Sequence, residues 1–311
     1  MSRAQSVHTL LLRPEPPYRL DLTAWALRRR RRNEIDRWDG AFVRVLLIES
    51  LPVEVRVEQV GHMRDPVLRV RATSPAELSE TACEEVRSQI VRLLGVEIDM
   101  GEFYELADAH PGFAELKDRF LGMRPPRFPG IFEALANAVA NQQLSLEVGL
   151  TLLNRMAAAF GTASSGDGGP AAFPSAEDIA VVRPDEVRRL GFSAAKTDYL
   201  LGIADAVAAG ALDERVLERV ERAEAQRQLL ALRGVGRWSA EYVLLRGLGR
   251  LDVYPGDDVG ARNALRGFFG LDHDPGYDEI QERLEPLDGV SGLLYFHLLL
   301  AGLAERGDIV A

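Results

Sequence analysis

Cysteine is almost absent from this sequence, which has 311 residues, one cysteine (Cys83) and five histidines. A single cysteine excludes an internal disulfide, and it provides neither the ligand spacing of a zinc site nor the four thiolates of an iron–sulfur cluster. The sequence also lacks an apolar run long enough to span a bilayer. Its N-terminus has too short an apolar core and too early a proline for a secretory signal. We therefore expect a globular, cytoplasmic protein of two or three domains, with no membrane segment.

Positive charge is scarce as well. The 37 Lys and Arg are outnumbered by 47 Asp and Glu, so the net charge is −10. This balance argues against indiscriminate binding to polyanions, although local patches rather than the sum decide the sign at any one face. A nucleic-acid role must therefore depend on a specific surface. The five arginines at 28–32 fit equally a phosphate-contacting surface and a solvated helix face that is paired with nearby acids.

Short β-rich runs occupy residues 41–72. The runs AFVRVLLIE, PVEVRVEQV and VLRVRA are separated by Leu51-Pro52 and by GHMRDP, and they predict strands of an antiparallel sheet. Ser74 is followed by Pro75 and, three residues on, by Glu77, which predicts a capped helix ending near Gly95. We predict an α+β domain over residues 1–105, with a helix laid on the sheet.

No convincing strand pattern returns after the proline-rich joint GMRPPRFPG, and helical periods fill the rest of the chain. We therefore predict an all-α domain over residues 106–311. Its expected helical segments are 131–160, 176–180, 184–190, 194–209, 214–232, 239–248, 259–269, 277–287 and 290–306.

Two glycines, Gly234 and Gly236, separate two of these helical periods in LRGVGRWSAEYVLLRG, which predicts a helical hairpin over about 223–248. Backbone N–H groups at the start of its second helix, for which Ser239 is the expected cap, attract an anion. The segment 233–250 contains four arginines and one glutamate, so it is locally basic. The same pattern also fits an ordinary helix connection with a glycine C-cap. The glycine pair alone favours this second interpretation.

The sequence downstream of the hairpin adds a second motif, VYPGDDVGARNAL. The combined run LRGVGRWSAEYVLLRGLGRLDVYPGDDVG resembles the helix-hairpin-helix plus Gly/Pro-Asp signature of the DNA glycosylase superfamily, in particular its 3-methyladenine DNA glycosylase II (AlkA-like) branch. DRWDGAFVRVL and PVEVRVEQVG resemble the N-terminal domain of that branch, and ALANAVANQQLSLEVG resembles its DNA-wedging helix and loop. The resemblance covers most of the chain. It implies a TBP-like α+β domain followed by an all-α helix-hairpin-helix glycosylase domain.

The resemblance also implies a reaction, in which the enzyme flips alkylated purines out of double-stranded DNA and excises them in base excision repair. Asp258 matches the catalytic aspartate, whose carboxylate stabilises positive charge on the sugar and orients water. The residue also fits an N-cap of the helix after it, and the two roles are compatible. Asp257 is the better candidate for a structural role. Gln143 or Leu144 matches the intercalating wedge, supported by Gln142.

The hairpin residues that the resemblance places against DNA phosphates are Arg233, Gly234, Val235, Gly236, Arg237 and Ser239. Lys196 fits either another phosphate contact or a solvated helix lysine. The amides of the predicted wedge also fit ordinary helix residues that are exposed to solvent. Consecutive amides are unusual, however, in an otherwise apolar helix.

Trp238 and Tyr242 are four residues apart, so they share one helix face and can present adjoining π-surfaces to a flipped base. A cationic alkylated purine gains further from an electron-rich indole. Two ordinary core aromatics remain the alternative. The second pocket tryptophan of the branch falls on Gly289 or Val290 here, so we name Phe128 and Trp25 as candidate replacements.

The resemblance also bears on reaction type. Bifunctional relatives carry a lysine nucleophile two residues after the second hairpin glycine, where this chain has Trp238, so no lyase activity is expected. We expect no cofactor, apart from a monovalent cation on carbonyls of the hairpin turn, and a monomer. Two other functions remain open: a glycosylase for oxidised or deaminated purines, and a non-catalytic helix-hairpin-helix DNA-binding protein. Asp258, the wedge amides and Trp238 together argue against the second.

Overall fold

The computed structural model describes residues 5–164 and 169–310. Its first part is a five-stranded antiparallel sheet in the order β1-β5-β4-β3-β2. One face is buried because apolar and polar residues alternate: in β5, Leu68, Val70 and Ala72 are buried while Arg69 and Arg71 are exposed. The strands are β1 (Ser6–Leu12), β2 (Arg37–Trp38), β3 (Phe42–Ile48), β4 (Leu51–Gln59) and β5 (Leu68–Ser74). The first two lie outside the predicted 41–72.

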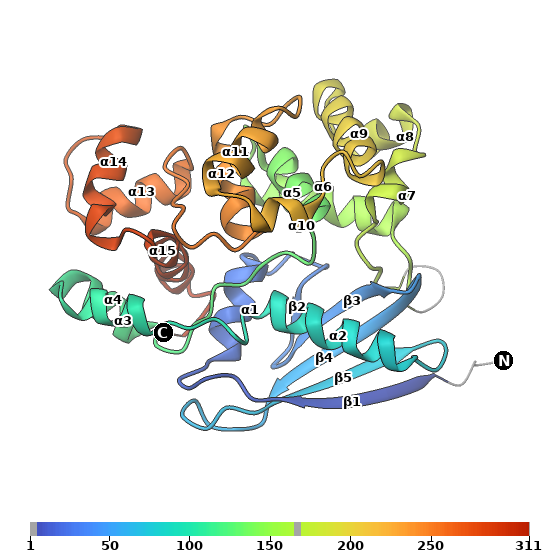
Figure 1. Ribbon diagram of the computed structural model, residues 1–311, viewed down its shortest axis with the longest axis horizontal. Coiled ribbons are helices and arrows are strands. Elements are labelled where there is room, and N and C mark those ends of the chain that lie inside the picture. Colours follow the sequence, from blue (N-terminus) through green and yellow to red (C-terminus); the bar gives the residue numbers. More distant parts are fainter. Residues whose placement is uncertain (1–4, 165–168, 311) are drawn as a thin grey trace.

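Helix α2 (Glu80–Leu93) lies along the sheet (Figure 1). The prediction that Ser74 caps this helix is wrong. Ser74 still pairs with Ser6 at the end of β5, and its hydroxyl donates to the carbonyl of Ala76. The cap is Ser79, whose side chain accepts the N–H of Ala82. The helix therefore starts only after the strand has ended and the chain has turned.

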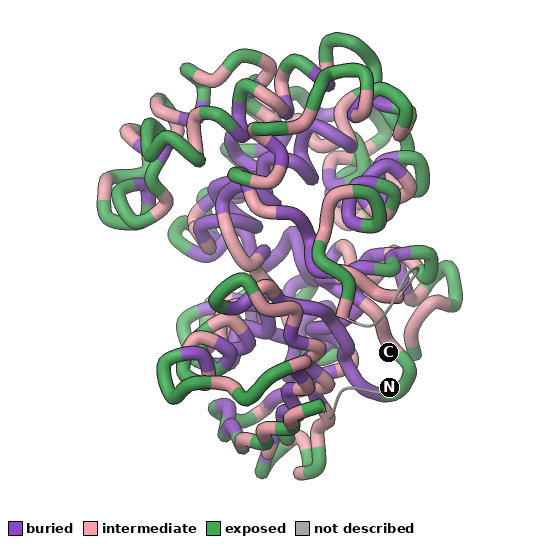
Figure 2. The backbone as a smooth tube through the Cα atoms, turned by 90° about the vertical axis from the view of Figure 1, so that its right-hand side faces the viewer, coloured by how far each residue is buried: buried purple, intermediate pink, exposed green. Residues whose placement is uncertain are grey.

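Three more helices connect the sheet to the rest of the molecule: α1 (Leu20–Arg28), α3 (Gly101–Asp108) and α4 (Pro111–Arg119). Their apolar residues share one buried cluster with those of the C-terminal helix α15 (Ser291–Glu305). Residue 106, the predicted domain boundary, falls inside α3. Figure 2 shows buried backbone, in purple, running between the two parts of the molecule. The core is therefore continuous across that boundary.

Helices make up the remainder of the described chain, where the only strand-like pairing is an isolated bridge between Ala163 and Ala171. The predicted fold class is confirmed. Two of the predicted helices are each divided into two helices in the structure. The segment 131–160 is interrupted by a turn, and the segment 214–232 is interrupted after Arg219. The elements are α5 (Ile131–Asn141), α6 (Leu146–Phe160), α7 (Ala176–Ala180), α8 (Pro184–Arg189), α9 (Ala194–Ala208), α10 (Glu214–Arg219), α11 (Arg222–Leu230), α12 (Arg237–Arg246), α13 (Val259–Phe268), α14 (Tyr277–Leu284), the 3₁₀ helix η1 (Glu285–Leu287) and α15.

No single helix in the described ranges is long and apolar enough to cross a membrane. Residues 277–287 and α15 reach the length and composition of a membrane span only when the two are joined. This pair is bent by 106°.

A buried ion-pair network connects the sheet to α5. Arg44 on β3 is 1% exposed, and it donates to Asp36 (2.6 Å) and to Glu133 of α5 (2.5 Å). Burial raises the pKa of Glu133, whereas the neighbouring guanidinium of Arg44 acts in the opposite direction. Removing Arg44 would leave two buried carboxylates without their cation. The network therefore fixes α5 relative to the sheet, and α5 leads directly into the candidate site.

Candidate active site

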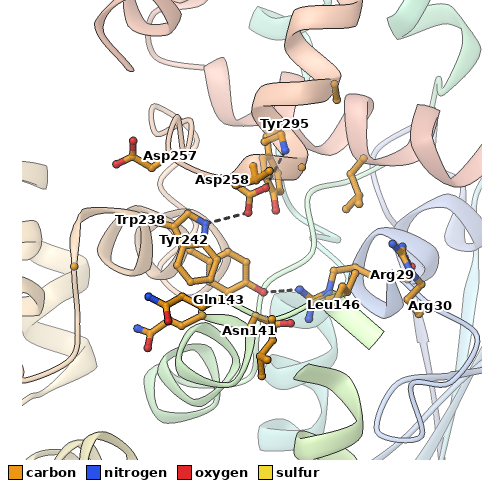
Figure 3. Close-up of a pocket in the computed structure, with 18 of the residues that line it drawn as sticks. Arg29, Arg30, Asn141, Gln143, Leu146, Trp238, Tyr242, Asp257, Asp258 and Tyr295 are labelled. Carbon is orange, nitrogen blue, oxygen red and sulfur yellow. Dashed lines mark hydrogen bonds between the residues drawn. The ribbon is translucent and has the colours of Figure 1, made fainter. Parts of the chain in front are cut away.

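A cleft of about 1140 Å³ opens where the end of α1 meets the α5–α6 turn, the α11–α12 hairpin and helices α13 and α15 (Figure 3). Although the protein has a net charge of −10, four basic side chains line this cleft against two acidic ones. The charged residues are Arg29, Arg30, Lys196, Arg306, Asp257 and Asp258. The charges that line the cleft are thus net positive, in contrast to the protein as a whole. The lining also includes Gln142, Gln143, Leu144, Trp238 and Tyr242.

Asp258 is held at this cleft by two hydrogen bonds. Its Oδ1 accepts the backbone N–H of Ala261 at 2.8 Å, which makes it the N-cap of α13. Its Oδ2 accepts the indole N–H of Trp238 at 3.0 Å. Both donors bind the carboxylate form, and the N-terminus of α13 favours negative charge there. The capping role and a half-buried carboxylate at the cleft therefore coexist in one residue.

Asp257 connects the aspartate turn to the hairpin. It accepts two hydrogen bonds from Arg237, from Nε at 2.6 Å and from Nη2 at 3.0 Å. The Arg237 guanidinium lies 3.8 Å from the centre of the Tyr277 ring, and the Tyr277 hydroxyl donates to Glu241 at 2.5 Å. Burial raises the pKa of Glu241. Asp257 is thus engaged in a contact that holds Asp258 near α12.

Trp238 and Tyr242 form an aromatic wall of the cleft. Their ring centres are 5.6 Å apart at 34°, and Tyr242 is only 2% exposed. The Tyr242 hydroxyl accepts a hydrogen bond from Nη1 of Arg29 at 2.8 Å (Figure 3). Arg29 belongs to the arginine run at 28–32, so this part of the run is neither solvated nor free for phosphate.

Two predicted pocket residues do not line the cleft. Trp25 is 8% exposed and lies in the apolar cluster of α1, α4 and α15. Phe128 is 2% exposed, and it packs behind Tyr242 at 6.2 Å between ring centres. Both are corrections to the expected pocket. Trp25 lies on the face of α1 that packs into the core, and the Phe128 N–H is bonded to the carbonyl of Arg246, which keeps its ring behind α12.

The sequence reasoning missed Arg29 and Tyr295 as lining residues. Gly289 and Val290, the positions aligned with a second tryptophan, lie at the turn before α15 and do not line the cleft. Tyr295 lies one helical turn further along, and it contacts the cleft instead. The run SGLLYFHLLL is apolar on all sides, so its sequence carries no signal for which face is exposed to the cleft.

The two hairpin glycines differ in their surroundings. Gly234 has φ +88°, and a Cβ there would lie 2.2 Å from the Tyr199 ring. Gly236 is the N-cap of α12, and a Cβ there would meet nothing within 4 Å. Ser239 is not the cap, since α12 starts at Arg237. Ser239 is 2% exposed, and its hydroxyl accepts from Nε2 of Gln142 at 3.0 Å.

The remaining hairpin residues are divided between core and surface. Val235 is 6% exposed and belongs to the main apolar cluster, so its side chain anchors the turn. The Arg233 guanidinium lies 5.8 Å from the centre of the Tyr199 ring. The open approach to the turn is therefore at Gly236, beside the first N–H groups of α12.

The α5–α6 turn projects two side chains beside the cleft. Gln143 has φ +53°, a left-handed conformation that is uncommon outside glycine and concentrates at functional sites. Leu144 is 43% exposed. Gln142 is held back, because its Nε2 also donates to the carbonyl of Gly234 at 2.7 Å. Leu144 is thus exposed while Gln142 is tied to the hairpin, and the wedge role of this turn stays a prediction.

Lys196 is not the solvated helix lysine considered for it, and its contact with a phosphate stays a prediction. Its Nζ donates to the carbonyl oxygens of Ala140 (2.9 Å) and Gln142 (2.8 Å) at the end of α5. Burial lowers its pKa. Lys196 therefore holds the base of the turn that carries Gln143 and Leu144.

Comparison with known proteins yields three kinds of match. The family described as "HhH-GPD superfamily base excision DNA repair protein" matches residues 136–288. The Bacillus subtilis protein named DNA-3-methyladenine glycosylase is 30% identical over 245 residues, which cover 78% of this chain and 80% of that protein.

Two solved structures have the same fold over much of their length. The 3-methyladenine DNA-glycosylase from Archaeoglobus fulgidus has a TM-score of 0.82 at 23% identity, covering 97% of this chain and 100% of its own. The Schizosaccharomyces pombe 3-methyladenine DNA glycosylase, solved in complex with abasic DNA, has a TM-score of 0.56 at 28% identity, covering 66% and 97%.

Proposed function

Since the chain belongs to the HhH-GPD superfamily of base excision DNA repair proteins, and within it to the DNA-3-methyladenine glycosylases, we propose that it removes alkylated purines from DNA by hydrolysis and leaves the strand uncut. The observation that carries this proposal is the position of Asp258. Its carboxylate is fixed by two donors at a basic cleft, beside an aromatic wall of the size of a base.

The reaction needs a fixed negative charge because breaking the bond between base and deoxyribose creates positive charge on the sugar. Asp258 supplies that charge, and it can accept the proton of the attacking water. Preorganisation matters here, since the N–H groups of Trp238 and Ala261 hold the carboxylate before substrate arrives.

Hydrolysis without strand cleavage is supported by the residues at the cleft. A lyase needs a free amine as its nucleophile. Trp238 stands at the hairpin position where bifunctional relatives carry lysine. Lys196, the only lysine among the described residues lining the cleft, donates to two backbone carbonyls instead.

The proposed partner is double-stranded DNA that contains a damaged base, bound by a cytoplasmic monomer. The exposed N-terminus of α12 at Gly236 is suited to a backbone phosphate, and Leu144 with Gln143 is suited to filling the gap left by an everted base. A monovalent cation on carbonyls of residues 233–236 remains part of this proposal.

The test is base release from duplexes carrying 3-methyladenine, hypoxanthine or 8-oxoguanine, measured in single turnover. We expect release of 3-methyladenine, with strand breaks only after alkali treatment and no borohydride-trapped adduct. Release of 8-oxoguanine alone would favour the oxidised-purine alternative, and release of no base would favour a non-catalytic DNA-binding protein.

Asp258→Asn separates catalysis from folding. Its amide oxygen can still accept the N–H of Ala261, but the negative charge is lost. We expect the release rate to fall at least about 10³-fold, as when a preorganised charge-stabilising group is lost. The free energy of unfolding should stay within about 1 kcal/mol, the value of an N-cap, and DNA affinity should be retained. Turnover like that of the wild type would contradict the assignment.

A further inference from the structure

The hydroxyl of Tyr242 is held by a buried cation. Arg29 is 5% exposed, and it donates from Nη1 to the Tyr242 oxygen and from Nη2 to Oδ1 of Asn137, both at 2.8 Å. Arg29 ends α1 in a left-handed conformation, φ +64°, and its backbone N–H is bonded to the carbonyl of Trp25. The N-terminal α+β part of the protein thus reaches into the cleft and orients a phenol there (Figure 3).

This contact determines the direction of the Tyr242 proton. A guanidinium only donates, so the phenol oxygen is the acceptor and its own O–H must point elsewhere. In the described part of the chain no group accepts that proton, and Tyr242 lines the cleft. A neutral phenol that already accepts from a cation is a strong donor, because hydrogen bonds in a chain polarise one another.

A second buried cation lies behind the same ring. The Arg246 guanidinium is fully buried, 5.8 Å from the centre of the Tyr242 ring and 5.4 Å from that of Phe128. Its Nη2 donates to the carbonyl of Ala26. Tyr242 therefore has two positive charges beside it, Arg246 behind its ring and Arg29 at its hydroxyl edge. Such a field stabilises negative charge on the base more than positive charge.

We propose that the Tyr242 hydroxyl donates a hydrogen bond to a ring acceptor of the everted purine, and that Arg29 is the residue that positions it for uncharged lesions. This inference deepens the proposed function and rests on it. The lesion class is a neutral purine with an acceptor at N3, N7 or O6, of which hypoxanthine is an example.

The electron count explains why charge matters. When the bond from C1′ to the base nitrogen breaks, its electron pair goes to the base. A cationic alkylated purine leaves as a neutral molecule, whereas a neutral purine leaves as an anion. Water adds its oxygen to C1′ and passes a proton to Asp258, and the released anion takes a proton from solvent. The Tyr242 hydrogen bond therefore helps the neutral lesion most, because only that lesion develops negative charge.

Tyr242→Phe tests the proposal, because it removes the hydroxyl and keeps the ring. Single-turnover release is measured for hypoxanthine and for 7-methylguanine, which is cationic in DNA, in the same duplex sequence. We expect the ratio of hypoxanthine release to 7-methylguanine release to fall about 10- to 100-fold, the range for a hydrogen bond to a developing charge, in addition to any loss that the two lesions share. Arg29→Met should give the same pattern, and the double variant should lose no more than the more damaged single variant.

The matched control is Tyr254→Phe. This substitution also removes a buried phenol, one that donates to the carbonyl of Ala261 in α13. It should lower release of both lesions by one common factor and leave their ratio unchanged. Thermal unfolding and binding to DNA with an abasic-site analogue identify any variant that has lost its fold. If one of Tyr242→Phe and Arg29→Met has lost it, the ratio of release rates in the other variant tests the proposal.

The outcomes separate this inference from the proposed function. If Tyr242→Phe lowers the release rates of the two lesions by the same factor, so that their ratio is unchanged, the inference is overturned. Wild-type protein that releases 7-methylguanine but no hypoxanthine would also overturn it while leaving the proposed function intact. Wild-type protein that releases neither lesion, nor 3-methyladenine, would contradict the proposed function itself.

Discussion

Gly234→Ala and Gly236→Ala should damage different properties, although the two glycines lie in one turn. We expect the first to lower stability and the second to lower DNA affinity. At Gly234 the backbone has φ +88°, and an added Cβ would lie 2.2–2.6 Å from three atoms of the Tyr199 ring. The left-handed backbone costs about 1–2 kcal/mol for alanine, and overpacking costs about 1–3 kcal/mol. We therefore expect Gly234→Ala to lower the free energy of unfolding by about 2–5 kcal/mol, on these two contributions.

Gly236→Ala should leave the fold almost intact. Its φ is −94°, and an added Cβ would meet nothing within 4 Å, so only the weaker capping by alanine remains, about 1 kcal/mol. The methyl group would occupy the open approach to the first N–H groups of α12. DNA affinity should therefore fall at least about 10-fold, and by the same factor for every sequence, because phosphate contacts carry no base information.

Urea denaturation followed by circular dichroism measures the first effect, and fluorescence anisotropy on labelled duplexes at one fixed salt concentration measures the second. Equal stabilities for the two variants would refute the assignment of Gly234 as the sterically required glycine. A loss of affinity in Gly236→Ala that depends on the DNA sequence would refute phosphate binding at the turn.

Three further predictions follow from other parts of the molecule. Leu144→Ala should slow release of a lesion paired in a duplex more than release from single-stranded DNA, because only the duplex needs a wedge; equal losses in the two assays would remove that role. Arg44→Met should lower the free energy of unfolding by about 3–5 kcal/mol, because Asp36 and Glu133 then stay buried without their cation; urea denaturation showing a change under about 1 kcal/mol would contradict the network's role. Burial lowers the pKa of His297 from 6.5 to about 4. The unfolded chain therefore binds a proton that the native state does not bind as pH falls from 6.5 to 4, so the free energy of unfolding should drop by about 3 kcal/mol over this interval. His297→Gln should lack that part of the pH dependence in urea titrations. If the free energy of unfolding of the variant falls with pH as steeply as that of the wild type, this prediction is contradicted.

Local patterns predicted several elements of this protein because their causes are local. Alternating apolar residues along β5 bury one face, and a glycine pair at the α11–α12 connection leaves a hairpin as the simplest reading. The N-cap role of Asp258 can be predicted from the sequence for a similar reason. A helix that begins immediately after an acidic residue takes that residue as its N-cap, whichever other role the carboxylate has.

Errors occurred where two local signals compete or where a helix has no polar face. Ser74 and Ser79 both satisfy the rules for a cap, and only the pairing of Ser74 with β1 decides against it. Trp25 and Arg29 are one helical turn apart on the same segment. Packing of α1 against α15, rather than its sequence, directs the tryptophan into the core and the arginine toward Tyr242.

The sequence by itself determined the order of the elements, the two turns that flank the cleft and the chemical types available there, since these depend on contacts within a few residues. Tertiary structure alone decided which side chains meet. Trp238 and Asp258 are 20 residues apart, and Arg29 and Tyr242 are 213 apart, yet each pair is joined by one hydrogen bond. Periodicity encodes which face of a helix is buried, but it carries no information on what that face is buried against.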